Sequence, residues 1–451
     1  MNLPRTLLVG HDSSPYIHKL RMYFAWRAIP FEEVQSRQQI YSDLITPRTG
    51  GTQIPVVVLD EKTVIGDSGR IMDHFESLLA KNGGLAKSRV PNFPLQPTTP
   101  RQAFVSNLFE FMSEEWLFFV GFSQRQLDTL RRFGPLDLHE EYLLNMVGEG
   151  SGRPTNLFAG RERARQALEM GFLRALKPWG VTPETLPKWN ESLERTLIAL
   201  SKHFDKHRFL LSDTHPCRGD FALAGQLSGF FARDPQPSFI LKTKAPNLER
   251  YIARMLATVP RAAYESPTRI TALDGASDPT GTVRVTRAND INEPAWLPND
   301  HIPETLFPAL TGVLDLVTHV ERVHALAVKY AAKKVAAGTS GTSVELPRAV
   351  GYPEFTMQGE VVGTRMAQVF SLYAWQRLWV GGVHVKSDAV DEVVRAIARA
   401  AANRDEVVEV ERVRDVARLV DSTPISRIAD KSVIVMDVRS VLAEGGGSAK
   451  L

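Results

Sequence analysis

The sequence predicts a small α/β domain over residues 1–80, a long helical part after it, and a mixed α/β tail. Three observations lead to this prediction. Up to residue 80, short apolar runs bounded by turn residues alternate with helix-like segments. From residue 100 onward, apolar residues recur at intervals of three and four, which is typical of amphipathic helices. Past residue 381, two valine-rich stripes with helical spacing precede one more short apolar run.

The order of elements in the first domain is β-α-β, a short helix, and then β-β-α. Four short apolar runs predict its strands, over residues 6–9, 31–34, 56–59 and 63–65. Ser13 and Ser14 precede a helix that we expect to run to about Trp26, because serine is a preferred residue at a helix start. Ser68 has the same relation to a helix that we expect to reach Leu79.

Two helix starts in this domain are candidate binding sites for an anion. A helix start leaves N–H groups unpaired and carries a partial positive charge, so a hydroxyl at Ser14 lies where a thiolate would be stabilised. Asp67 and Ser68 form a second start that could hold an amino group and a carboxylate together. Ile54-Pro55 precedes a strand, and a cis bond there would turn the neighbouring backbone outward to pair with an extended peptide.

These residues resemble the N-terminal half of a glutathione S-transferase. Ser14-Pro15-Tyr16-Ile17 falls where the family has a Cys/Ser-Pro-x-x helix start, Ile54-Pro55 falls on its cis-proline, and Asp67-Ser68 falls on its acidic residue–serine pair. Later segments are similar to a long bacterial-type subgroup and extend the resemblance over residues 5–378. These segments are residues 114–117, 180–185, 209–211, 219–223, 233–235 and 373–377.

The resemblance implies a division of the chain into domains. Residues 1–80 are expected to form a thioredoxin-like α/β domain that binds glutathione, followed by a linker over residues 81–100. Residues 101–380 are expected to form an enlarged all-α glutathione-transferase C-terminal domain. Residues 381–451 lie beyond the resemblance and are expected to form a mixed α/β extension. The two apolar stripes of this extension need a covering surface, and they either fold back on the chain or dock onto another protein.

The resemblance also implies a catalytic role for Ser14. Its hydroxyl would donate a hydrogen bond to the sulfur of glutathione, the co-substrate, and lower the pKa of the thiol, so that the thiolate attacks an unidentified electrophile. Ser13 is the alternative hydroxyl, and from the residues alone a simple capping role is favoured for either serine. The implied glutathione-binding residues are Arg48, Gln53, Ile54, Pro55, Asp67 and Ser68. Serine in place of cysteine at position 14 makes disulfide or dehydroascorbate reduction the less favoured chemistry, and no metal is expected.

A second class of function is also open. Glutathione-transferase folds are reused as non-catalytic subunits of larger assemblies, and this chain could join one by docking through its C-terminal extension. The family usually forms homodimers, which is the other expected partnership. A third possibility, a chloride-channel-like protein that inserts into membranes, is disfavoured because the sequence offers no suitable apolar helix.

The helical part contains three further features that bear on function. The aromatic stripe that includes Trp116 is interpreted as core packing rather than as the wall of an acceptor-substrate pocket. Glu110, Glu114 and Glu115 are expected to lie on a solvated face. Cys217 occupies the hydroxyl position of the family's Ser/Thr-x-x-Asp capping box, of which only the Asp220 half is expected to be intact. The remaining predicted elements are helices over residues 156–176, 185–207, 222–231, 304–337, 364–379, 390–401 and 410–420, strands over 354–360 and 432–438, and a loop over 262–305.

Composition narrows the class of protein. Apolar residues make up 43% of the 451 residues and charged residues 23%, which is ordinary for a globular protein. A net charge of +3 without a dense basic run argues against a nucleic-acid partner. The single cysteine excludes a disulfide framework and fits the cytoplasm, or the mitochondrial matrix if a targeting peptide has been removed. No apolar run reaches the roughly 18 residues of a membrane span.

Overall fold

The computed structural model of the protein describes most of the chain in separate segments. These are residues 3–36, 38–81, 94–129, 176–256, 268–272, 283–287, 295–338, 341–380, 383–401, 403–423, 425–427 and 433–439. Residues 82–93 of the predicted linker, and all but the last residue of the predicted helix over 156–176, lie outside them.

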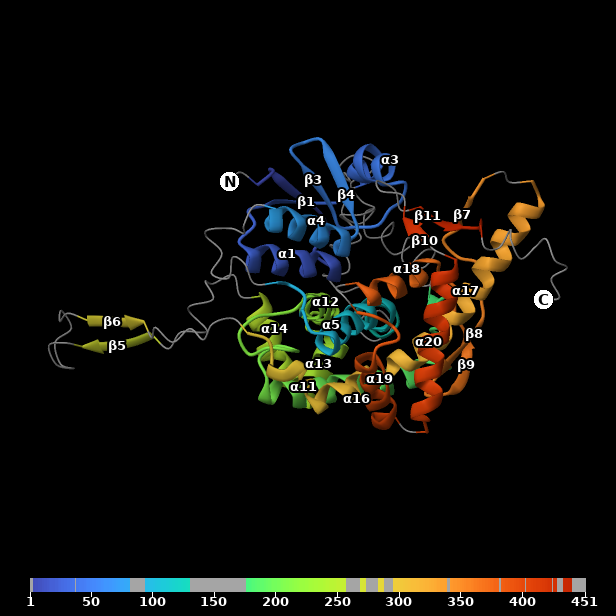
Figure 1. Ribbon diagram of the computed structural model, residues 1–451. Helices are drawn as coiled ribbons and strands as arrows, with labels where there is room; N and C mark the ends of the chain where they lie inside the picture. The colour runs from blue at the N-terminus through green and yellow to red at the C-terminus, as the bar shows by residue number, and fades with distance from the viewer. Residues whose placement is uncertain are drawn as a thin grey trace.

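The N-terminal domain is built on a four-stranded sheet with the order β2-β1-β3-β4. Its strands are β1 (Thr6–Gly10), β2 (Glu32–Gln35), β3 (Val56–Leu59) and β4 (Thr63–Gly66). β1 and β2 are parallel, whereas β3 is antiparallel to both of its neighbours. Two helices, α1 (Pro15–Arg27) and α4 (Ser68–Lys81), cover one face of the sheet (Figure 1). The predicted thioredoxin-like domain is therefore confirmed.

Successive side chains of a strand point to opposite faces of the sheet, and in this sheet both faces are covered by apolar residues. Leu8 packs in the main core, which also contains Phe24 of α1 and Phe75 of α4. Val9, the next residue, belongs to a smaller cluster with Ile45, which comes from the helical connection between β2 and β3. This connection consists of α2 (Gln38–Ile40), the π-helical segment Tyr41–Ile45 and α3 (Thr46–Thr49).

The remainder of the chain is mainly helical, as predicted. Its longer helices are α5 (Pro100–Met112), α6 (Phe118–Ser123), α11 (Leu186–Lys206), α12 (Arg218–Gln226), α13 (Pro235–Lys244), α14 (Asn247–Leu256), α17 (Gly312–Ala336) and α18 (Phe370–Gln376). A π-helical segment, Ser113–Leu117, joins α5 to α6, and a second one, Leu227–Phe231, continues α12. Every residue of α12 is buried, which confirms the prediction of a central buried helix.

The N-terminal domain packs so closely against the helical part that backbone atoms of the two lie next to each other. α1 lies against α12 (Figure 1). A Cβ atom on Gly225 would lie 2.7 Å from the carbonyl oxygen of Pro15, and one on Gly229 would lie 2.6 Å from the Cα of Pro15. Both distances are shorter than side chains tolerate, so glycine at these two positions permits the close approach. The start of α1 is thereby fixed against the helical part.

The C-terminal extension folds back on the chain. Its helices α19 (Asp388–Ala400) and α20 (Glu406–Ser422) pack against each other, α19 also contacts α5, and α20 contacts α17 (Figure 1). Strands β10 (Ile425–Arg427) and β11 (Ile434–Asp437) join β7 (Ser343–Leu346) in one sheet. Buried residues form the two predicted apolar stripes: Val390, Val393, Val394 and Ile397 on α19, and Val410, Val413, Val416 and Val420 on α20. Docking of these stripes onto another protein therefore loses its support.

Several predicted elements differ from the structure. Residues 262–305 were expected to be loop-like, but they contain an antiparallel pair, β5 (Thr268–Ala272) and β6 (Val283–Arg287), drawn apart from the main body in Figure 1. The strand over 354–360 is a hairpin of β8 (Glu354–Met357) and β9 (Glu360–Thr364). The helix expected from residue 364 begins only at Phe370, because Ala367 exchanges backbone hydrogen bonds with Val350 and Gly351 instead.

Other differences concern helix boundaries. The helix over 304–337 is divided into a short turn, Glu304–Leu306, α16 (Phe307–Leu310) and α17. None of the helices in the described segments combines the length and the apolar character needed to cross a bilayer.

Candidate functional site

The predicted site residues lie together where β1 and β4 end and β3 begins, at one end of the strands, which we call the sheet edge below. Val56, the first residue of β3, is paired with Gly66, the last residue of β4. On its other side Val56 is paired with Val9, one residue before the end of β1. Because β3 runs antiparallel to both strands, its beginning lies beside their ends. Three segments therefore leave the sheet at this edge: residues 11–14, 54–55 and 67–68.

Ser14 is the N-cap residue of α1. Its backbone is extended, with φ −82° and ψ 123°, and its carbonyl oxygen accepts the first helical hydrogen bonds, from Ile17 at 3.1 Å and His18 at 3.4 Å. Pro15 follows at the first helical position, where its missing N–H removes no hydrogen bond. The Ser14 hydroxyl makes no capping hydrogen bond. The predicted capping role is thus carried by the backbone alone, and the side chain is not engaged by the helix.

Ser13, the alternative hydroxyl, is engaged within the protein. It is buried, and both its N–H and its Oγ lie close to Nδ1 of His11, at 3.1 and 3.0 Å. Because Nδ1 accepts the Ser13 N–H, the imidazole is neutral at this nitrogen. Burial, the largest influence, lowers the pKa of His11 to about 4, which agrees with a neutral ring. Of the two serines, Ser14 is the one whose hydroxyl has no hydrogen-bond partner within the described segments.

The helical part holds the segment that carries these serines. Arg125 is buried and donates from one terminal nitrogen to the Ser13 carbonyl at 2.8 Å, and its Nε lies 2.8 Å from Asp234. Arg233 donates to the Asp12 carbonyl at 2.9 Å and to its carboxylate at 2.6 Å. Burial alone would raise the pKa of Asp12, but hydrogen bonds from two arginines outweigh it and hold that pKa well below its usual range.

Sequence reasoning missed this anchoring. Arg233 and Asp234 were noted only as part of the resemblance, and Arg125 was not singled out. The separation of 109 residues between Arg125 and Asp234 explains the omission, because no local pattern connects them. The sequence offers one signal, a charged residue at the end of a long aromatic stretch, and the structure places it in a π-helical segment, Gln124–Thr129, that continues α6.

The second helix start is capped by Asp67 rather than by Ser68. Oδ1 of Asp67 accepts the N–H groups of Gly69 at 2.9 Å and Arg70 at 3.1 Å, and Ser68 is the first residue of α4. The prediction that Ser68 caps the helix is therefore wrong. Asp67 has φ 75°, a left-handed conformation that is uncommon outside glycine, asparagine and aspartate. The pair still lies at the start of a helix, as predicted.

The predicted binding residues before β3 do not all lie at the same end of the strands. The Ile54-Pro55 bond is cis, and Pro55 is buried beside Gly10, the last residue of β1. Gln53 is exposed next to it. Arg48 instead donates to the Lys62 carbonyl at 2.6 Å, in the turn between β3 and β4 at the opposite end of these strands. The structure therefore brings together all of the predicted binding residues except Arg48.

A buried polar cluster adjoins the start of α4. Lys19 of α1 is 1% exposed, and its Nζ lies 2.8 Å from Glu110 and 3.0 Å from Glu114. Arg218 of α12 binds the other oxygen of Glu110 at 2.5 Å and the Gly69 carbonyl at 3.0 Å. This cluster joins both helices of the N-terminal domain to the helical part.

The charges of this cluster alter its ionisation. Burial raises the pKa of Glu114 to about 7, with the negative charges of Glu110 and Asp67 adding to the effect and Lys19 opposing it. Burial alone would lower the pKa of Lys19, but the two carboxylates outweigh it and raise that pKa. The expectation of a solvated face was wrong, since the side chains of Glu110, Glu114 and Glu115 are only 7%, 10% and 4% exposed.

Two other candidate residues belong to the core. Trp116 is 3% exposed and stacks on Trp189 at 6.2 Å between ring centroids, which confirms the core-packing interpretation. Cys217 is fully buried, and burial together with the Asp220 charge raises the pKa of its thiol well above the usual value. It caps α12 in a complete capping box, in which Asp220 accepts the Cys217 N–H at 2.9 Å. Only the Asp220 half was expected.

Comparison with known proteins shows which family the N-terminal part of the chain is similar to. Residues 8–83 match the family model described as the glutathione S-transferase N-terminal domain. None of the curated proteins gives a significant match.

Several solved structures are similar to the chain. β-Etherase LigF from Sphingobium sp. strain SYK-6 is 16% identical, with 57% of this chain and 97% of that chain covered and a TM-score of 0.38. A glutathione S-transferase from Methylobacterium radiotolerans, in complex with glutathione sulfonate, is 19% identical over 58% and 93%, with a TM-score of 0.33. Another from Methylobacillus flagellatus, with GSH bound, is 16% identical over 56% and 95%, with a TM-score of 0.32.

The family match and the sheet geometry agree on the same residues. The match covers the last three residues of β1 and all of α1, β3, β4 and α4, the elements whose ends bring the predicted site residues together. The similarity to a long bacterial-type subgroup beyond residue 83 stays a prediction. Over residues 8–83 the chain is therefore similar to the glutathione S-transferase N-terminal domain.

Proposed function

We propose that the protein binds glutathione at this sheet edge and activates its thiol for conjugation to an electrophile. The observation that carries the proposal is the strand register, which sets Ser14, Pro55 and Asp67 at neighbouring strand ends. The Ser14 hydroxyl is not used by the helix it caps, so it is available to donate to a sulfur anion. The start of α1 adds partial positive charge at the same place.

The other groups would hold the body of the tripeptide. The backbone next to the cis Ile54-Pro55 bond would pair with the extended cysteinyl segment, with Gln53 exposed beside it. Asp67 and Ser68 would hold the amino and carboxylate groups of the γ-glutamyl end. Arg48 is not included, because its guanidinium is bound to the Lys62 carbonyl at the far end of the strands.

The experiment is a comparison of Ser14→Ala with the unmodified chain on immobilised glutathione and in a conjugation assay with 1-chloro-2,4-dinitrobenzene. We expect Ser14→Ala to be retained on the column but to lose conjugation by about a hundredfold to a thousandfold, the range for removing one hydrogen-bond donor to a developing anion. The pKa of the bound thiol, followed by thiolate absorbance, should rise in the variant.

The control variant is Ser42→Ala, which removes an exposed hydroxyl of the same domain that is already bonded to the Gln39 carbonyl and to Asp43. It should behave as the unmodified chain. Retention and conjugation that are both unaffected by Ser14→Ala would refute the catalytic role of this residue. If the unmodified chain is neither retained on immobilised glutathione nor active in the conjugation assay, the proposed function is refuted.

A further inference from the structure

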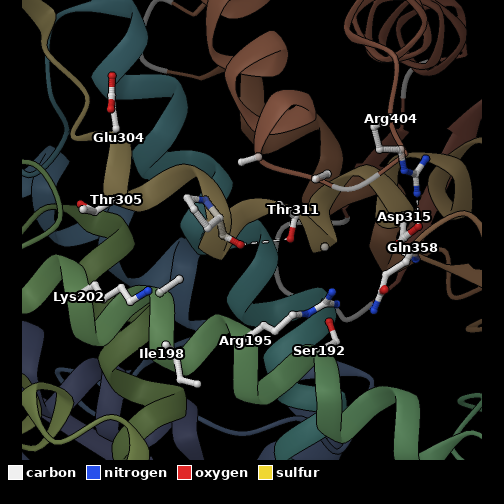
Figure 2. A pocket seen from close by; sticks show the side chains of 15 residues that line it. Ser192, Arg195, Ile198, Lys202, Glu304, Thr305, Thr311, Asp315, Gln358 and Arg404 are labelled. Atoms are coloured by element: carbon white, nitrogen blue, oxygen red, sulfur yellow. Dashed lines mark hydrogen bonds and ion pairs between the residues drawn. The ribbon is translucent and has the colours of Figure 1, made fainter.

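A cavity of about 510 Å³ lies in the helical part, among residues that the glutathione proposal does not use. Its walls are α11, the segment from Glu304 to the start of α17, the turn between β8 and β9, and three residues of the C-terminal extension, Ala400, Ala401 and Arg404 (Figure 2). These elements are far apart in sequence, and the C-terminal extension supplies one wall. The C-terminal extension therefore takes part in forming the cavity.

Two cations on α11 face this cavity without a partner. Arg195 and Lys202 are seven residues apart, which places them on one side of the helix about 10.5 Å apart along its axis. Figure 2 shows both side chains extending over the cavity. Neither makes an ion pair or a hydrogen bond with another residue in the described part of the chain. Lys188, on the same helix, differs because it is paired with Glu360.

The helix surface between these cations is apolar. Ile198 and Ala199 occupy the intervening turn and line the cavity floor. Ser192, one turn before Arg195, is 8% exposed, and its hydroxyl has no hydrogen-bond partner among the residues described. Its proton is therefore available to a ligand beside the guanidinium. The order along the helix is a cation with a hydroxyl, an apolar stretch, and a second cation.

The opposite walls do not neutralise these charges. Arg404 donates to Asp315 and to Glu409, the latter at 2.9 Å. The acidic Asp315 of this wall is therefore paired with Arg404 and not with Arg195 or Lys202. The Thr311 hydroxyl is committed to the Pro308 carbonyl at 3.2 Å. Glu304, the other acidic lining residue, lies away from Arg195 across the cavity (Figure 2).

We propose that this cavity binds a small organic dianion, with an acidic group at each end of a short apolar segment. Arg195 binds one acidic group through its planar guanidinium, with Ser192 donating to the same group. Lys202 binds the other group as a point charge. The apolar segment lies on Ile198 and Ala199. Carboxylates and phosphates share this chemistry, and the experiment separates them.

The test is calorimetric titration of the full chain with linear α,ω-dicarboxylates of increasing length, with the corresponding alkanediol bisphosphates, and with monocarboxylates. We expect one chain length to bind best and to bind more tightly than the monocarboxylate. Arg195→Gln and Lys202→Gln should each weaken binding by about tenfold to a hundredfold, because each removes one charge-assisted hydrogen bond. The better-bound series identifies the acidic group.

The matched control is Lys206→Gln, which removes an exposed charge from the same helix outside the cavity lining and should leave binding unchanged. Thermal unfolding of each variant checks that the fold is retained. Ser14→Ala should also leave binding unchanged, so this proposal and the proposed conjugation activity fail separately. Absence of binding, equal binding of mono- and dicarboxylates, or an equal loss in Lys206→Gln would overturn the proposal.

Discussion

Replacement of Glu114 by glutamine should remove a pH-dependent loss of stability. Glu114 lies at the contact between the N-terminal domain and the helical part, where burial raises its pKa from an ordinary 4.5 to about 7. Between these two pH values the folded chain keeps a proton that the unfolded chain has released. The unfolded state then binds fewer protons, so the free energy of unfolding falls as pH rises through this window.

The magnitude follows from the two pKa values. They differ by about 2.5 (7 − 4.5), and each pH unit in which one proton is held by only one state corresponds to about 1.36 kcal/mol. The unmodified chain should therefore lose about 3 kcal/mol from this group between pH 4.5 and 7. Glutamine carries no titratable proton, so the difference in unfolding free energy between Glu114→Gln and the unmodified chain should grow by that amount across the window.

Urea unfolding at closely spaced pH values measures this difference. A direct readout accompanies it, because the part of the infrared carboxyl band that comes from protonated Glu114 should disappear as pH rises through about 7 in the unmodified chain and should be missing from the variant. Asp220, whose pKa burial raises to about 6, contributes to this band in both chains. Glu191→Gln is the matched control, since Glu191 is an exposed residue of α11, and its difference should be flat. A flat difference for Glu114→Gln, or one that shrinks with rising pH, would refute the reasoning.

Three further predictions concern the contact between the two parts. Cys217 should resist labelling by a water-soluble disulfide reagent in the folded chain and react only on unfolding, because its thiol is fully buried and its pKa is raised. Gly225→Ala should destabilise the chain by about 1–3 kcal/mol in urea unfolding, since the added methyl would lie 2.7 Å from the Pro15 carbonyl oxygen. Arg125→Lys should reduce the proposed conjugation rate by more than its loss of stability explains, because a lysine keeps the charge beside Asp234 but lacks the guanidinium fork that also reaches the Ser13 carbonyl.

Each of these has its own control. Rapid labelling of Cys217 in the native chain would contradict its burial. Gly312→Ala adds a methyl group where no atom lies within 4 Å, and it should be neutral or slightly stabilising. An Arg125→Lys variant with a full conjugation rate would show that the Ser13 carbonyl does not need this anchor.

Local sequence patterns predicted the sheet well and the caps less well. All four strands of the first domain lie within one residue of the predicted boundaries, because short apolar runs between turn residues define both the strand and its ends. The cap of α4 was assigned to Ser68 because serine and aspartate are equally good N-caps. The structure distinguishes the two, because Oδ1 of Asp67 accepts the N–H groups of Gly69 and Arg70 and Ser68 is already the first residue of the helix.

Periodicity predicted which helices exist but not what covers them. The stripes of α19 and α20 were found from valine spacing alone, whereas their burial against α5 and α17 depends on contacts across the whole chain. The error at Glu110 has the same origin, since its partners Lys19 and Arg218 are 91 and 108 residues away. A carboxylate on a helix is ordinarily solvated, and only a distant cation makes its burial possible.

Two sets of polar contacts fix the start of α1, and with it the proposed glutathione site, to the helical part. Arg125 holds the carbonyl of the residue before Ser14, and Lys19 ties the first turns of α1 to Glu110 and Glu114. Both cations are buried and multiply bonded, and removing Arg125 leaves the buried Asp234 carboxylate without the cation that binds it, which costs about 3–5 kcal/mol. The segment that carries Ser14 is consequently held by residues of the helical part. An isolated N-terminal domain would retain the sheet edge but lose these anchors, and we expect it to hold Ser14 less rigidly than the complete chain does.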